Sequence, residues 1–191
     1  MDGVLVFSEE AWFRVYNDTL TSFGHPAISR AEFLAIYGNG TKADRDMYMP
    51  ERAVEEVDEA YRRFFETHLD AIRPNEEALP ALLALRGHGV RLAVATNTNR
   101  PLAERILRLA GLERAVDALA GADEAGAGKP DPAVVRLAAD RAGVPLAECL
   151  FVGDSRYDEA AAAAAPVRFL GYRYGEGERI ASLMDLLKRL G

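Results

Sequence analysis

The spacing of apolar residues divides the chain into two zones, the first of which is helical. From about residue 9 to residue 89, apolar side chains recur every three or four positions, a period that predicts amphipathic helices. Ser29 and Glu32 have the spacing of a capping box, which indicates a helix start. Pro50 and Pro74 each open a further helical pattern, because proline suits a first helical turn.

The second zone, from residue 90 onward, alternates short apolar runs with helical patterns. The runs 90–95 and 149–152 are bounded by glycine or polar residues, as is typical of buried strands in a parallel sheet. Further strands are predicted at 117–120 and 167–171, and helices at 101–110, 132–142, 160–165 and 179–190. This alternation predicts an α/β fold with residues 1–8 and 90–191 as its parallel-sheet core and residues 9–89 inserted as a helical domain.

Composition and charge narrow the class of protein. The 191 residues carry 23 Lys and Arg against 30 Asp and Glu, a net charge of −7, which disfavours nucleic acid and anionic membranes as partners. The single cysteine, Cys149, excludes an intrachain disulfide, and no apolar run is long enough for a membrane span. The first residues lack the features of a signal peptide. We therefore expect a soluble, cytoplasmic protein that is a monomer or a weak homodimer.

Polar residues that carry chemistry follow the predicted strands. Because ligands of open parallel sheets bind beyond the carboxyl ends of the strands, we expect these residues to share one edge of the sheet. They are Asp2, Thr96, Asn97, Lys129, Asp154 and Asp158. Carboxylates beside a lysine suit a hard cation such as Mg²⁺ next to a phosphate group, with the ammonium facing the anion.

Four short motifs resemble those of the haloacid dehalogenase superfamily, in its phosphatase-like branch that includes phosphoglycolate phosphatases and beta-phosphoglucomutases. Asp2-Gly3-Val4-Leu5 matches the end of Asp-x-Asp-Gly-(Thr/Val)-Leu, and Thr96 matches the hydroxyl residue that closes an apolar strand. Lys129 precedes Pro130 as in the third motif, and Gly153-Asp154-Ser155-Arg156-Tyr157-Asp158 matches Gly-Asp-x-x-x-Asp. The resemblance spans essentially the whole chain and implies a Rossmann-like core with an inserted helical cap.

The resemblance implies a Mg²⁺-dependent phosphomonoester hydrolase that acts on a small phosphorylated metabolite through an aspartyl-phosphate intermediate. Asp2 would protonate the leaving oxygen and then activate water, while Thr96, Asn97 and Lys129 would hold the phosphoryl group. The implied Mg²⁺ ligands are Asp154, Asp158 and the main-chain carbonyl of Asp2.

Each of these residues also has a structural interpretation. Asp2 before Gly3 fits a turn, and Lys129 fits a solvated lysine ahead of a helix. Asp154 fits a helix N-cap, and Asp158 would complement the dipole of the same helix. The catalytic interpretation is favoured because the four motifs occur together and in order.

The first motif departs from the family pattern. The place of the nucleophilic aspartate is directly before Met1, and the apolar strand that would lead into it is absent from the sequence. We expect the natural protein to begin several residues earlier, and the chain as written to be impaired. An alternative from another class is a catalytically inactive protein that binds phosphate or metal.

Two further observations bear on the substrate. The segment from Gly38 to Arg45 is interpreted as a loop between cap helices, from which Lys42 and Arg45 would contact an anionic or polyhydroxyl substrate, although solvated surface charge fits them equally well. A sugar-phosphate mutase is less favoured, since the similar mutases carry a histidine at the position occupied here by Trp12. Dehalogenase chemistry is disfavoured because those relatives lack the equivalent of Asp2.

Overall fold

The computed structural model describes residues 1–190 and divides the chain into two compact units. One unit is the continuous segment Phe7–Arg73, and the other combines Met1–Val6 with the chain from Pro74 onward. The helical unit is therefore shorter than the predicted 9–89. The reason is that the helix α5 (Ala78–Gly87) supplies Ala78, Ala81 and Leu82 to the hydrophobic core of the second unit.

The unit Phe7–Arg73 is helical. Its elements are α1 (Glu9–Ser22), α2 (Arg30–Ile36), α3 (Thr41–Tyr48), α4 (Val54–Phe65) and the 3-10 helix η1 (Leu69–Ala71). The capping box at the start of α2 is confirmed, because the Ser29 hydroxyl accepts a bond from the Glu32 amide and the Glu32 carboxylate accepts one from the Ser29 amide at 2.8 Å. The long helix begins at Val54 rather than at Pro50. Just before it, the main-chain amide of Ala53 donates a hydrogen bond to the Glu56 carboxylate.

The predicted loop from Gly38 to Arg45 is wrong from Thr41 onward, where α3 begins. The apolar period missed this helix because its one buried residue is an acid, Asp44. The Tyr61 hydroxyl of α4 donates to the Asp44 carboxylate at 3.0 Å, and both side chains are buried. Burial raises the pKa of Asp44 to about 7, against the smaller, opposing effect of the bond from Tyr61.

The second unit contains two parallel sheets. In the first sheet β3 (Ala93–Thr96) pairs with β4 (Ala118–Gly121), and in the second the order is β5 (Leu150–Gly153), β6 (Arg168–Tyr172) and β7 (Arg179–Ile180). The very short strands β1 (Val6–Phe7) and β2 (Arg73–Pro74) pair with each other. The predicted α/β fold of parallel strands is confirmed.

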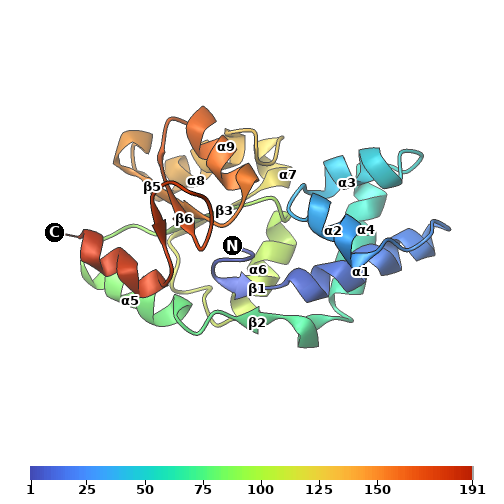
Figure 1. Cartoon of the computed structure of the whole chain (residues 1–191), viewed down its shortest axis with the longest axis horizontal. Helices are drawn as coiled ribbons and strands as arrows, with labels where there is room; N and C mark the ends of the chain where they lie inside the picture. Colours follow the sequence, from blue (N-terminus) through green and yellow to red (C-terminus); the bar gives the residue numbers. More distant parts are fainter. Residues whose placement is uncertain (191) are drawn as a thin grey trace. The chain divides into compact units, whose positions relative to one another are not determined.

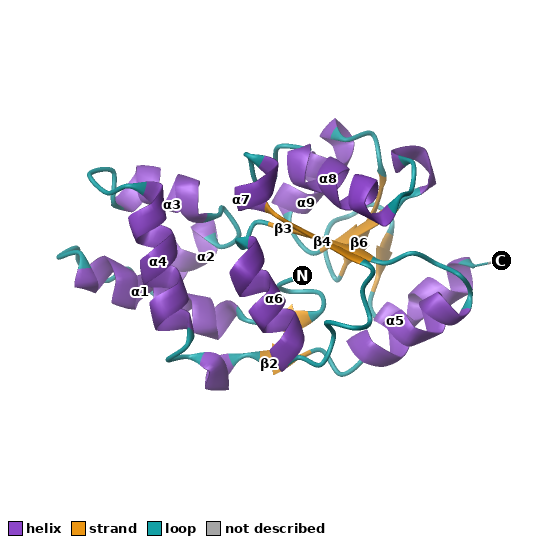
Figure 2. Ribbon diagram, turned by 180° about the vertical axis from the view of Figure 1, so that it is seen from behind, coloured by secondary structure: helices purple, strands orange, loops and turns teal. Residues whose placement is uncertain are grey.

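Helices flank the strands on two sides, as Figures 1 and 2 show for α5 on one side and for α8 and α9 on the other. The remaining elements of this unit are α6 (Arg100–Leu109), α7 (Ala122–Ala125), α8 (Ala133–Ala142), η2 (Leu146–Glu148), α9 (Arg156–Ala164) and η3 (Leu183–Arg189). The predicted closing helix over 179–190 is wrong at its start. Arg179 and Ile180 extend the second sheet, and the 3-10 helix η3 begins after Ser182, whose hydroxyl accepts a bond from the Met184 amide.

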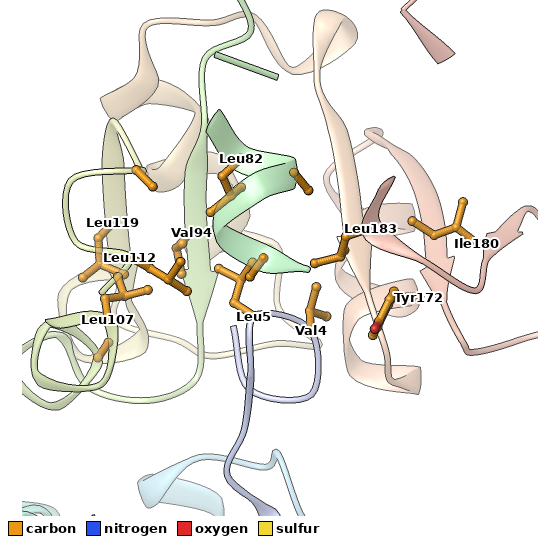
Figure 3. Close-up of a cluster of buried hydrophobic side chains, with 14 of the residues drawn as sticks. Val4, Leu5, Leu82, Val94, Leu107, Leu112, Leu119, Tyr172, Ile180 and Leu183 are labelled. Atoms are coloured by element: carbon orange, nitrogen blue, oxygen red, sulfur yellow. The ribbon is translucent and has the colours of Figure 1, made fainter. Parts of the chain in front are cut away.

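The strands alternate their side chains between two hydrophobic clusters, as the period of two in a strand requires. Val94 packs in the cluster with α5 and α6, whereas Ala95 packs in the cluster with α8 and α9. Val4 and Leu5 of the first turn belong to the α5 cluster, and in Figure 3 they lie between the Val94 group and Tyr172. The first residues of the chain therefore join the two sheets through side-chain packing.

Candidate active site

The loop that carries Lys129 is fixed by the residue that follows Thr96 at the end of β3. The Asn97 side chain accepts a hydrogen bond from the Lys129 amide at 2.6 Å and donates one to the Lys129 carbonyl at 2.8 Å. Asn97 thus holds both main-chain polar groups of one residue, as a neighbouring strand would. Its amide is occupied by this contact, although the sequence predicted a phosphate contact for it.

The Lys129 ammonium lies where the two sheets end. Its Nζ donates to Asp158 Oδ1 at 2.7 Å and approaches the Ala95 carbonyl of β3 at 3.4 Å. The exposed fractions of the two side chains are 10% for Lys129 and 6% for Asp158, so this is a buried ion pair. Burial raises the pKa of Asp158, but the adjacent ammonium prevails and the net effect is a lowered pKa. The interpretation of Lys129 as a solvated lysine is therefore wrong.

Asp158 organises the start of α9. Its Oδ2 accepts hydrogen bonds from the Ser155 hydroxyl at 2.6 Å and from the Asp154 amide at 3.2 Å. Ser155 is the N-cap of α9, and its hydroxyl also accepts from the Asp158 amide. Ser155 was not among the predicted site residues, although a serine three residues before an acid is a signal of a helix start. Both oxygens of Asp158 are therefore engaged by protein groups.

Asp154, at the end of β5, faces the first turn of the chain. A Cβ atom at Gly3 would lie 1.8 Å from Asp154 Oδ2, and the φ angle of Gly3 is +73°, so glycine is required there for two reasons. Burial raises the pKa of Asp154 to about 6, while the N-terminal ammonium and Lys129 favour its ionised form. No hydrogen bond or ion pair engages its carboxylate within residues 1–190. Asp154 does not cap α9, since Ser155 holds that position.

Asp2 lies in the same region, at the other end of the first turn. The Thr98 hydroxyl donates to Asp2 Oδ2 at 3.2 Å, so a second threonine after β3, which the sequence analysis did not single out, contacts the predicted acid–base residue. The amino group of Met1 is buried, and burial together with the charge of Lys129 lowers its pKa. The negative charges of Asp2, Asp158 and Asp154 act in the opposite direction, but the net effect is a lowered pKa of the Met1 amino group.

The structure thus brings together the six predicted polar residues of the sheet edge. They are Asp2, Thr96, Asn97, Lys129, Asp154 and Asp158. Thr96 is buried at the end of β3, where its hydroxyl accepts from the Thr98 amide at 3.2 Å. Among residues 1–190, no group of three or more His, Cys, Asp or Glu side chains is arranged to hold a metal ion.

The two predicted substrate contacts belong to the helical unit. Lys42 is exposed on α3, and Arg45 forms an ion pair with Asp46 at 3.1 Å. The Nε atom of Arg45 is buried without a hydrogen-bond partner in the described part of the chain. A role for either residue in substrate binding stays a prediction.

A family model, curated relatives and solved structures all indicate the same family. Residues 1–166 match the model of the haloacid dehalogenase-like hydrolases. A phosphoglycolate phosphatase from Cereibacter sphaeroides is 32% identical over 215 aligned positions, which cover 100% of this chain and 96% of that protein. One from Neisseria meningitidis is 35% identical over 136 residues, 71% of this chain and 58% of that protein, so this match spans little more than half of the relative.

Solved structures of this family also share the fold. A hydrolase of the superfamily, subfamily IA, from Geobacter sulfurreducens superposes with a TM-score of 0.71 at 26% identity, covering 100% of this chain and 93% of that chain. The chain belongs to the haloacid dehalogenase-like hydrolases. Within them it falls in the phosphoglycolate phosphatase-like branch, and it is a homologue of phosphatases. No helix among residues 1–190 combines the length and the apolar character needed to cross a bilayer.

Proposed function

We propose that this chain is the framework of a Mg²⁺-dependent phosphomonoesterase that acts on a small phosphorylated metabolite, with 2-phosphoglycolate as the first substrate to test. The main support is the buried Lys129 ammonium, held by Asp158 at the carboxyl ends of two parallel strands. A fixed cation with few competing waters suits the oxygens of a phosphoryl group, whose charge it offsets. The similarity to phosphoglycolate phosphatases supports the choice of substrate.

The proposed reaction has two displacements at phosphorus. In a chain extended by an aspartate directly ahead of Met1, a carboxylate oxygen of that aspartate would bond to phosphorus while the ester P–O bond breaks, and Asp2 would give its proton to the leaving oxygen. Asp2 then takes a proton from a water molecule, whose oxygen displaces the aspartate and releases inorganic phosphate. Thr96 and Lys129 hold the phosphoryl oxygens during both steps.

The carboxylates of the site fit Mg²⁺ in part. Asp154 offers oxygen atoms that no protein group engages within residues 1–190, and the main-chain carbonyl of Asp2 is proposed as a second ligand. Asp158 was the third ligand implied by the sequence, but both of its oxygens accept protein hydrogen bonds, so we assign it first to holding Lys129. Bound Mg²⁺ would neutralise charge on the transferring phosphoryl group.

The proposal is tested with a chain that carries an apolar strand ending in aspartate directly before Met1. We expect hydrolysis of p-nitrophenyl phosphate and of 2-phosphoglycolate that depends on Mg²⁺. In that chain D154N lowers the rate by more than about 100-fold, because a proposed Mg²⁺ ligand loses its negative charge. The control D140N removes an exposed carboxylate of α8 and leaves the rate unchanged.

Two results would contradict the proposal. The first is no hydrolysis of either ester by a folded, extended chain at saturating Mg²⁺. The second is an unchanged Mg²⁺-dependent rate in D154N, which would remove Asp154 from the site. In the first case, phosphate binding measured by calorimetry without turnover would favour an inactive binding protein instead.

A further inference from the structure

The helix α5 is apolar on every side. From Ala78 to Leu85 it contains only alanine, leucine and proline, and a helix of that kind is normally covered all round by other elements. Here one side is covered by the hydrophobic core, whereas Leu79 is 41% exposed and Leu83 is 53% exposed. The helix α4 shows the ordinary pattern, because its exposed residues are all charged. They are Glu55, Glu56, Glu59, Arg62 and Arg63.

The 3-10 helix η3 lies beside α5 on the outside of the α/β unit (Figures 1 and 2). The Glu77 carboxylate joins the two elements, because it accepts hydrogen bonds from the Ser182 hydroxyl at 2.9 Å and from the Leu183 amide at 2.8 Å. The next residue of η3, Met184, is 40% exposed. The exposed apolar side chains of this region therefore come from two neighbouring elements.

Four exposed residues form one stripe along α5 and the turn that leads into it. They are Glu76, Leu79, Leu83 and Arg86. Residues three or four positions apart share a helix face, and these follow one another at spacings of three, four and three. Glu77 has helical dihedral angles and its carbonyl accepts a hydrogen bond from the Ala81 amide at 3.0 Å, so the turn continues the helical path. The stripe thus has an acid at one end, a base at the other end and two leucines between them.

Both charges of the stripe can interact with a group from outside the chain. The Glu76 carboxylate has no hydrogen bond or ion pair within residues 1–190. The Arg86 guanidinium donates to the Arg114 carbonyl and lies 3.6 Å from the Asp117 carboxylate, yet its side chain is 40% exposed. A guanidinium has five N–H donors, so Arg86 is able to bond to a further carboxylate.

The stripe is complementary to a second copy of itself in one orientation. When two α5 helices pack antiparallel about a two-fold axis at the level of position 81, Glu76 faces Arg86 of the partner subunit. Leu79 then faces Leu83 of the partner subunit, because both pairs are centred on position 81. Parallel packing of the same helices would instead bring like charges together at each end, which disfavours it.

We propose that the stripe from Glu76 to Arg86, together with Met184, is the contact surface of a homodimer in which the α5 helices of two copies pack antiparallel. The apolar residues provide the association energy, and the two Glu76–Arg86 pairs at the ends fix the orientation. The stripe is about 15 Å long, and a stable complex buries about 800 Å² on each partner, so this dimer is weak and forms reversibly. The dimer does not depend on the proposed phosphomonoesterase activity.

Sedimentation equilibrium of the chain measures the association. The monomer mass is 20.9 kDa, and we expect the average mass to rise toward twice that value between about 10 µM and about 1 mM protein. L83E places a charge in the middle of the stripe and should remove this rise. The matched control L109E changes a leucine of α6 that is 41% exposed and lies outside the stripe, so it should keep the rise.

Exchanged charges test the antiparallel orientation. E76R gives the stripe two basic ends and R86E gives it two acidic ends, so each variant alone should stay monomeric at concentrations where the unmodified chain associates. The double variant E76R/R86E again places an acid opposite a base at both ends, so its association should return. Far-ultraviolet circular dichroism confirms that each variant is folded, and E76R with L83E decides the proposal if R86E does not fold.

Three results would overturn the homodimer. The first is a mass of 20.9 kDa at every concentration. The second is association of L83E or E76R that equals that of the unmodified chain. The third is a folded double variant that stays as monomeric as E76R. Hydrolysis of phosphate esters does not enter this test, so a monomer that hydrolyses them would overturn the dimer and leave the proposed enzyme standing.

Discussion

The buried acid of the helical unit makes its stability depend on pH. Asp44 ionises near pH 3.8 when the chain is unfolded, but burial raises its pKa to about 7 in the folded chain. Between these values the folded state binds more protons, so stability falls as the pH rises. The difference is about 3 pKa units at about 1.4 kcal/mol each, or about 4 kcal/mol by pH 8.

The variant D44N removes this effect and keeps an oxygen that can accept the bond from Tyr61. We expect D44N and the unmodified chain to have similar free energies of unfolding near pH 4. At pH 8 the variant should be more stable by up to about 4 kcal/mol, because it buries no charge. The control D46N, which removes an exposed carboxylate of the same helix, should show no such change with pH.

Trp12 provides the assay. It is the only tryptophan of the chain, and its ring lies 5.7 Å from that of Tyr61 and 5.3 Å from that of Phe65, so its fluorescence reports unfolding of the helical unit. Urea titrations of both chains at pH 4 and pH 8 give the two differences in free energy. A D44N effect that is the same at both pH values would refute the assignment of a raised pKa to Asp44.

Two further substitutions test the packing around the site. G3A should lower the free energy of unfolding by about 1–3 kcal/mol more than G143A, because both glycines have positive φ angles but only the Cβ at Gly3 meets Asp154. Equal losses in urea titrations would contradict the close approach. N75A should cost about 1–3 kcal/mol, because the buried Asn75 amide donates to the Tyr172 hydroxyl at 3.0 Å and to a main-chain carbonyl. A loss below about 0.5 kcal/mol would show that water replaces these bonds.

The sequence predicted the strand ends because local signals coincide there. Asp154 follows an apolar run and a glycine, and Thr96 closes another such run, so the rule for open parallel sheets brings them to one edge. The helix α3 was missed because its buried residue is charged. Arg179 was assigned to a helix because a strand of only two residues, Arg179–Ile180, is too short to show a period of two.

The sequence could not predict which residues of the site form hydrogen bonds with one another, and the reason is physical. The hydrogen bond from Lys129 to Asp158 joins residues that are 29 positions apart in the sequence, and the hydrogen bonds between Asn97 and Lys129 join residues that are 32 positions apart. Such distances along the chain carry no pattern of their own, since only the folded arrangement of β3, β5 and the loop before α8 brings these residues together. The same holds for the contact of Thr98 with Asp2.

The two hydrogen bonds between the Asn97 side chain and the main chain of Lys129 affect the entropy that the Lys129 side chain would lose on binding a ligand. A free lysine side chain loses about 2 kcal/mol of rotamer entropy when it is immobilised. Here Asn97 fixes the backbone and Asp158 fixes the ammonium while the chain folds. The entropy loss is therefore complete before any ligand arrives, so the proposed contact with a phosphoryl group would cost little further ordering of this side chain.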